Sequence, residues 1–170
     1  STACGHGTIA LVTWALDEGV VERSEGVNHV IVDVPSGRLD TWAHVENGRV
    51  RSVRFRNVPA FVWAEGVELD DHTVDVAFGG AFYACLEERV EPEELPRLIE
   101  LGRELKRKIE AWQDVVHPLE PALRDIYGVI FWQEETEDPL TQRNVAVFAD
   151  GEVDRSPCGS GTSARLALLD

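Results

Sequence analysis

Two short stretches of this sequence share residues that could do acid–base chemistry. Residues 4–10 read Cys-Gly-His-Gly-Thr-Ile-Ala and residues 158–164 read Cys-Gly-Ser-Gly-Thr-Ser-Ala, so both follow the pattern C-G-x-G-T-x-A. A cysteine leads each copy, and apolar residues follow each copy. The repetition suggests that each copy is one half of a single site.

Each copy is predicted to lie at the start of a helix. The apolar residues after Gly7 indicate a buried helix that Gly19 would end, and Cys158 follows a predicted strand and turn and opens a second helix. A cysteine at a helix N-terminus faces the positive end of the helix dipole and the unpaired N–H groups of the first turn, which favour the thiolate. The adjacent glycines leave these N–H groups open to a carboxylate.

Two such units on opposite sides of one bound molecule would suit stereoinversion. One thiolate would remove a proton from the carbon next to a carboxylate, and the other thiol would return a proton to the opposite face. Backbone N–H groups would stabilise the negative charge that develops on the carboxylate in the transition state. This reaction needs neither a metal nor an organic cofactor.

Other interpretations of the cysteines fit less well. Cys4 and His6 could supply two zinc ligands, but neither motif has the close C-x-x-C pair of zinc sites. The phosphate-binding patterns G-x-x-x-x-G-K-[ST] and G-x-G-x-x-G are absent. Glycines at a helix start with an incidental cysteine would explain one copy, but not two matched copies. Cys85 lies in an apolar stretch and is expected to be a small buried hydrophobe.

The segments between the motifs predict a mixed α and β scaffold. Residues 28–63 are rich in valine and alternate in polarity, and Asn47-Gly48 is a strong signal for a two-residue hairpin turn. Residues 91–116 carry apolar side chains at helical spacing and predict an amphipathic helix. Other expected features are strands at 73–78, 127–132 and 144–148, a bulge or close backbone approach at Gly79-Gly80, a loop at 117–125 and a turn at Asp150-Gly151.

Composition limits the partners and the compartment. The chain has 170 residues and a formal net charge of −15, which repels nucleic acids and anionic membranes. No apolar run approaches the ~20 residues of a membrane span, and no signal peptide is expected. The count of three widely spaced cysteines argues against a disulfide framework and favours a reducing compartment, so we expect a cytoplasmic protein.

The residues around both cysteines resemble the motifs of the proline racemase family. Residues 154–162, Asp-Arg-Ser-Pro-Cys-Gly-Ser-Gly-Thr, are similar to the family's second cysteine motif, and residues 4–9 are similar to its first. Residues 76–84 and 143–151 are also family-like. The resemblance covers nearly the whole chain and is loosest at 20–60.

The resemblance implies a fold and two acid–base residues. The fold is the α/β (α+β), two-lobed fold of diaminopimelate epimerase, in which each lobe is a curved, mostly antiparallel sheet wrapped around a central helix. Cys4 and Cys158 would be the two catalytic thiols. Backbone N–H groups would hold the substrate carboxylate, and they would come from Gly5, His6, Gly159 and Ser160.

The resemblance also implies the substrate class. The family contains proline racemases, 4-hydroxyproline 2-epimerases and trans-3-hydroxyproline dehydratases, which act on small imino acids without a cofactor. Asp154 would face the protonated ring nitrogen, and Phe148 would form an aromatic wall against the ring. Members are often dimeric, which leaves a homodimer open.

The departures from the family pattern leave three activities open. Dehydratases typically replace one thiol with Thr or Ser, so two cysteines favour racemisation or epimerisation of proline or hydroxyproline. Residues 80–83, Gly-Ala-Phe-Tyr, are nevertheless more similar to the dehydratases. The chain also lacks Met and begins almost at the first motif, so we expect an inner fragment of the family, which would itself be inactive if too much scaffold is missing. Residues 1–62 would be the end of the first lobe, and residues 63–170 most of the second.

Overall fold

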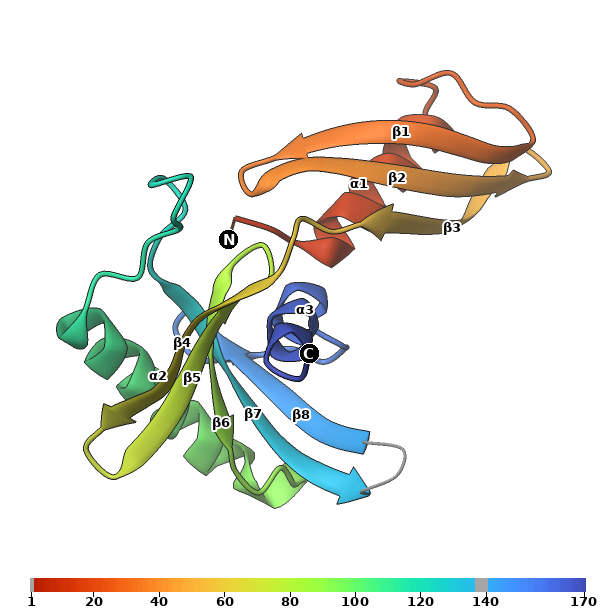
Figure 1. The fold of residues 1–170 in the computed structure, drawn as a ribbon. Coiled ribbons are helices and arrows are strands. Elements are labelled where there is room, and N and C mark those ends of the chain that lie inside the picture. Colours follow the sequence, from red (N-terminus) through yellow and green to blue (C-terminus); the bar gives the residue numbers. More distant parts are fainter. Residues whose placement is uncertain (1, 137–140) are drawn as a thin grey trace. The chain divides into compact units, whose positions relative to one another are not determined.

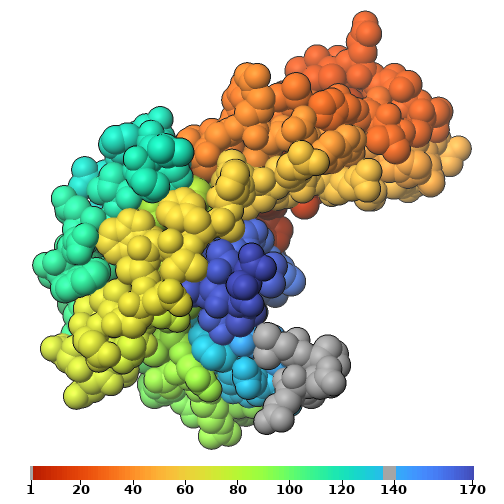
Figure 2. All heavy atoms as spheres, viewed as in Figure 1, coloured from red at the N-terminus to blue at the C-terminus, as the bar shows by residue number. Residues whose placement is uncertain are grey.

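The computed structural model describes residues 2–136 and 141–170 and forms two compact units, Ser1–Pro59 and Ala60–Asp170. Figure 1 shows their helices and strands, and Figure 2 shows the atoms of the same units in the same colours. In the described part of the chain, no helix has both the length and the apolar character that a membrane span requires.

The first unit is one helix packed on a three-stranded antiparallel sheet. It contains α1 (Gly5–Asp17), β1 (Gly26–Val34), β2 (Gly37–Glu46) and β3 (Arg49–Arg56), with the strands in sequence order. Buried and half-exposed residues alternate along β2, as expected when one face of a sheet covers a core. That core joins helix to sheet through Val12, Leu16, Val32 and Ala43.

The hairpin between β2 and β3 has the expected tight turn. Asn47 and Gly48 both have positive φ, 53° and 69°, which matches the type I′ turn that suits the twist of paired strands. The carboxylate of Glu25 accepts hydrogen bonds from both turn amides, at 3.1 Å from Asn47 N and 2.7 Å from Gly48 N. The sequence prediction of a two-residue turn is confirmed.

The second unit is a six-stranded sheet with a helix on each face (Figure 1). Its strands are β4 (Phe61–Leu69), β5 (His72–Phe78), β6 (Phe82–Glu87), β7 (Ile126–Thr136), β8 (Thr141–Phe148) and β9 (Glu152–Val153), in that order. Its helices are the short 3₁₀ helix η1 (Pro92–Glu94), α2 (Leu95–Trp112) and α3 (Gly159–Ala167). Neighbouring strands are antiparallel except β6 and β7, which are parallel and joined through α2.

Two neighbouring residues of β7 show how the helices divide the faces. A Cβ atom at Gly102 of α2 would lie 3.5 Å from the ring of Phe131, and a Cβ atom at Gly161 of α3 would lie 2.6 Å from Ile130. Successive side chains of a strand point to opposite faces, so α2 and α3 cover different faces of the sheet.

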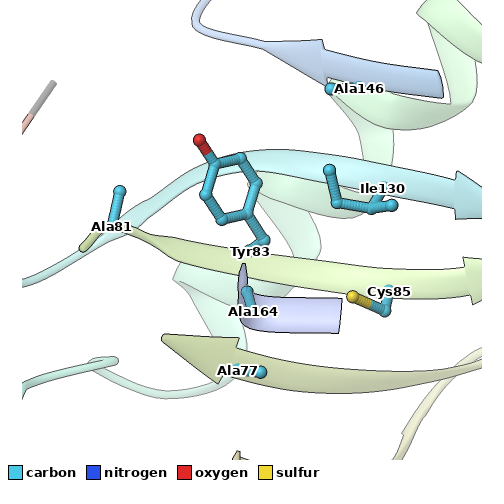
Figure 3. Close-up of a cluster of buried hydrophobic side chains, with 7 residues drawn as sticks. All are labelled: Ala77, Ala81, Tyr83, Cys85, Ile130, Ala146 and Ala164. Atoms are coloured by element: carbon cyan, nitrogen blue, oxygen red, sulfur yellow. The ribbon is translucent and has the colours of Figure 1, made fainter. Parts of the chain in front are cut away.

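Small side chains bring α3 close to the sheet. The buried cluster of Figure 3 contains Tyr83, Cys85 and Ile130 together with four alanines, namely Ala77, Ala81, Ala146 and Ala164. Gly79 extends this close packing, because a side chain there would overlap the backbone of α3 at Ser160. The expected close approach at Gly79-Gly80 is confirmed.

Three elements differ from the sequence predictions. The expected helix at 91–116 is the 3₁₀ turn η1 followed by α2, which ends at Trp112 because Gln113 is extended. Helix α1 was expected to be buried, but only one of its sides is: Ile9, Leu11 and Trp14 are exposed. Strand β6 was not predicted, because Phe82 to Leu86 are all buried and its polarity therefore does not alternate.

Candidate functional site

Cys4 stands immediately before the first turn of α1. It is the N-cap residue, with extended backbone, and its exposed Sγ accepts a hydrogen bond from the backbone N–H of Gly7 at 3.3 Å. The N–H groups of a first helical turn have no partner four residues back, so they face whatever lies beyond the helix start. The local arrangement predicted for the first motif is confirmed.

A pocket of about 160 Å³ opens beside Cys4 in the same unit. Its lining includes Gly7, Thr8 and Leu11 of α1 and Val34 at the end of β1. Gly5 begins the helix and a Cβ atom there would contact the ring of Phe55 at 3.5 Å; His6 follows it and is exposed.

Cys158 occupies the same position relative to α3. It is the N-cap residue, again with extended backbone, and it is half-buried. Gly159 begins the helix, and a Cβ atom there would meet nothing within 4 Å, so the approach to the first N–H groups is open on this side. The positive end of the helix dipole and the N–H groups of the first turn lie together at this helix start, so the position favours binding of an anion.

The second glycine of each motif has a shared steric reason. A Cβ atom at Gly7 would lie 3.3 Å from the Sγ of Cys4, and a Cβ atom at Gly161 would lie 3.1 Å from the Sγ of Cys158. Any larger residue would press on the sulfur that the motif presents. The pattern C-G-x-G therefore keeps space for the thiol as well as for a ligand.

The hydroxyl of Tyr83, a residue not predicted to belong to the site, lies beside Cys158. Tyr83 Oη is 2.8 Å from Ser160 Oγ and 3.5 Å from Cys158 Sγ, and the two latter atoms are 4.0 Å apart. Burial, and then the nearby Cys158, raise the pKa of Tyr83 far above its ordinary value. Tyr83 therefore carries a neutral hydroxyl. The available signal was a tyrosine within the apolar run of residues 82–86, since a buried tyrosine hydroxyl needs a polar partner.

Phe148 is joined to this cluster by stacked rings. Its ring lies against Tyr127 at 5.6 Å between centroids, and Tyr127 meets Tyr83 edge to face at 5.8 Å. Asp154 follows β9, and its Oδ1 accepts hydrogen bonds from the backbone N and the Oγ of Ser156, at 3.2 and 3.1 Å.

The candidate residues fall into two groups. Cys4, Gly5 and His6 belong to the first unit. The candidates in the second unit are Phe148, Asp154, Cys158, Gly159 and Ser160, and among them the structure brings Cys158, Gly159 and Ser160 to one helix start. The roles given to these residues stay predictions.

Cys85 differs from the two motif cysteines. It is buried between β5 and α3, and burial raises the pKa of its thiol to about 12. A thiol in this state is a poor nucleophile and a poor base at neutral pH. The prediction that Cys85 is structural is confirmed. Among the described residues, no group of three or more His, Cys, Asp or Glu side chains is placed to hold a metal ion.

Comparison with known proteins places these motifs in one class. The family described as "Proline racemase" matches residues 1–170. A trans-3-hydroxy-L-proline dehydratase of Bacillus thuringiensis is 44% identical over 99% of this chain and 53% of its own length. A proline racemase of Clostridioides difficile is 39% identical over 98% of this chain and 52% of its own length.

A solved structure agrees with this classification. The hydroxyproline epimerase of Agrobacterium vitis, crystallised with bound trans-4-hydroxy-L-proline, superposes with a TM-score of 0.89 at 32% identity. The match covers 99% of this chain and 51% of that chain. These likenesses define the class as the proline racemase family, whose matched members are named for reactions of proline and hydroxyproline.

The chain belongs to the proline racemase family. Its fold is the mixed, mostly antiparallel diaminopimelate-epimerase-like fold expected from the sequence. The chain spans about half the length of the curated relatives it matches.

Proposed function

We propose that the complete protein inverts the α-carbon of proline or a hydroxyproline with Cys4 and Cys158 as its two acid–base thiols. The observation that carries the proposal is the repeated arrangement at α1 and α3. In each unit a cysteine is the N-cap residue of a helix whose first turn is rich in glycine. The second glycine of the motif leaves room for the sulfur of that cysteine. Family membership supports the substrate class.

The reaction would proceed by proton transfer alone. One cysteine, as the thiolate, takes the proton from the α-carbon, and the electron pair of that C–H bond delocalises into the substrate carboxylate. The other cysteine, as the thiol, gives its proton to the opposite face of the same carbon. Each turnover leaves the first sulfur protonated and the second deprotonated, so the enzyme emerges ready for the reverse direction.

The remaining candidates would bind the substrate. Backbone N–H groups of Gly5 and His6 on one side, and of Gly159 and Ser160 on the other, would hold the carboxylate at the helix starts. Asp154 would pair with the protonated ring nitrogen. Phe148, already stacked on Tyr127, would provide a flat apolar wall for the pyrrolidine ring.

The test is the loss of stereoinversion in single-thiol variants. The protein is expressed from its whole reading frame and incubated with L-proline and with trans-4-hydroxy-L-proline, and optical rotation is followed. Cys4→Ser and Cys158→Ser should each lower the rate by about 10²- to 10⁴-fold, because a hydroxyl is a far weaker base than a thiolate. Cys85→Ser is the matched control and should retain most of the activity. A near-normal rate in either motif variant would refute the two-thiol mechanism.

Dehydration of trans-3-hydroxy-L-proline is the second candidate function. It is favoured by the dehydratase relative at 44% identity. In this reaction one thiolate takes the α-proton, and the 3-hydroxyl leaves as water after receiving a proton from an acid. Incubation with trans-3-hydroxy-L-proline distinguishes the two functions, since dehydration gives a pyrroline product and inversion gives only a change of optical rotation.

A further inference from the structure

Three polar side chains of the second unit meet beneath the start of α3. Tyr83 comes from the central strand β6, and Cys158 and Ser160 come from the N-cap and first turn of α3. Tyr83 is fully buried and Ser160 is 8% exposed, so bulk water does not compete for their hydroxyls. The Tyr83 hydroxyl lies within hydrogen-bond distance of both the Ser160 hydroxyl and the Cys158 sulfur.

We propose that Tyr83 and Ser160 form a reversible hydrogen-bond relay that positions Cys158 and supports it both as thiolate and as thiol. This inference rests on the proposed function, in which Cys158 changes its protonation state at every turnover. Tyr83 is a positioning residue in this scheme and does not touch the substrate.

The first state of the relay serves the thiolate. The Ser160 O–H donates to Tyr83 Oη over 2.8 Å, and the Tyr83 O–H donates to the Cys158 sulfur over 3.5 Å. Both buried hydroxyls then have a partner, and the negative sulfur receives a donor from the side of the sheet. A hydrogen bond to a charged group is stronger than one between neutral groups, so this state favours the thiolate.

The second state serves the thiol. The Cys158 S–H donates to Tyr83 Oη, and the Tyr83 O–H turns to donate to Ser160 Oγ. The same three atoms remain paired, and only the directions of the hydrogen bonds are reversed. No covalent bond is made or broken within the relay, because rotation of the hydroxyls is sufficient.

Tyr83 is suited to this role because it does not give up its proton. Its pKa is raised by burial, so the phenol stays neutral beside either form of the sulfur. The packing also fixes its position, since Tyr83 is fully buried in one cluster with Ala77, Ala81 and Ala164 (Figure 3). Because the Tyr83 side chain is held in place and stays neutral, its O–H can turn from Cys158 to Ser160 without displacing the Cys158 sulfur.

The test follows the alkylation of Cys158 against pH and needs no substrate. The protein from the whole reading frame is treated with iodoacetamide between about pH 5 and pH 10, and modification of the Cys158 peptide is quantified by mass spectrometry. Tyr83→Phe keeps the ring but removes the donor to the thiolate. We expect the pH midpoint of alkylation to rise by about one unit, or the rate below the midpoint to fall about tenfold.

Two further variants separate the relay from a general effect on packing. Tyr83→Phe leaves the buried Ser160 hydroxyl with only the Cys158 sulfur, 4.0 Å away, as a partner, so the double variant Tyr83→Phe/Ser160→Ala removes both polar groups together. The relay predicts that the double variant keeps the raised midpoint, because the thiolate still lacks its donor. Recovery of the wild-type midpoint would overturn the relay. Thr162→Val, which removes an exposed hydroxyl from the same helix, is the control and should leave the midpoint unchanged.

Alkylation and stereoinversion are measured separately, so the relay and the proposed function can fail independently. If Tyr83→Phe moves the alkylation midpoint, the relay is supported even where no stereoinversion is detected, and only the proposed function fails. If the midpoint stays in place while the wild-type protein inverts its substrate, the relay is overturned and the function stands. In an active enzyme, Tyr83→Phe should lower kcat with little change in KM, because the substrate-binding groups are unchanged.

Discussion

Gly79 lies directly against the backbone of α3, so that a Cβ atom at this position would overlap the carbonyl oxygen of Ser160. The same atom would lie 2.5 Å from the backbone nitrogen of Ala164. The loop after β5 therefore sets the depth at which α3 sits on the sheet. The height of Cys158 above Tyr83 depends on this contact.

Gly79→Ala should destabilise the protein by displacing α3. Overpacking of this kind costs about 1–3 kcal/mol, and the clashing atoms are backbone atoms that cannot move aside independently. Denaturant unfolding of the variant measures the loss. The matched control is Gly159→Ala, whose new Cβ atom meets nothing within 4 Å and should leave the unfolding free energy nearly unchanged. Equal stability of the two variants would mean that the contact at Gly79 relaxes without cost.

Cys85 should make stability fall at alkaline pH. Burial raises the pKa of its thiol from 9.0 to about 12, so the folded state holds this proton more tightly than the unfolded chain. The contribution of this proton to the free energy of unfolding is complete below pH 9 and is lost as the pH rises toward 12. The unfolding free energy should fall by up to about 1.4 kcal/mol per pH unit in this range. Tyr83, whose pKa is also raised, acts in the same direction at higher pH.

The measurement compares urea unfolding at about pH 8 and about pH 10. Cys85→Ala should be less stable at the lower pH, because it leaves a small cavity, yet it should lose less stability as the pH rises. Val74→Ala also shortens a buried side chain, but it removes no titrating group, so its pH slope should equal that of the wild type. If the unfolding free energy of Cys85→Ala fell with pH as steeply as that of the wild type, Cys85 would not be the group that causes the loss of stability.

Arg165 should resist replacement by lysine. Its guanidinium carbon lies 3.8 Å from the centre of the Trp132 ring, its Nε donates to Gln142 Oε1 at 3.0 Å, and the residue is 7% exposed. Lysine lacks the planar group that stacks on the indole and the fixed Nε–H, so Arg165→Lys should cost about 1–3 kcal/mol of unfolding free energy. Arg38→Lys alters an exposed ion pair with Asp33 and should change stability little.

The sequence predicted those features whose cause is local. A cysteine followed by glycines and an apolar run marks a helix start, and both motif cysteines are N-cap residues. Asn47-Gly48 predicted its turn because few residues tolerate two successive positive φ angles. These features depend on neighbours in the chain, which the sequence shows directly.

Features that depend on distant contacts were not predictable in this way. Strand β6 is buried on both faces by elements far along the chain, so its apolar run lacks the alternation that marks a strand. The contact of Tyr83 with Cys158 joins residues 75 positions apart. A tyrosine in an apolar run signals only that some polar partner exists, and the fold determines which one.

The burial of Cys85 has a practical consequence for spectroscopy. Of the three cysteines in this chain, Cys4 is exposed and Cys158 is half-buried, whereas Cys85 is enclosed in the core. A thiol-directed spin label applied to the folded protein should therefore attach at one position in each unit without any engineered residue. Pulsed dipolar spectroscopy on this doubly labelled protein would therefore measure the distance between the N-cap positions of α1 and α3 without any change to the sequence.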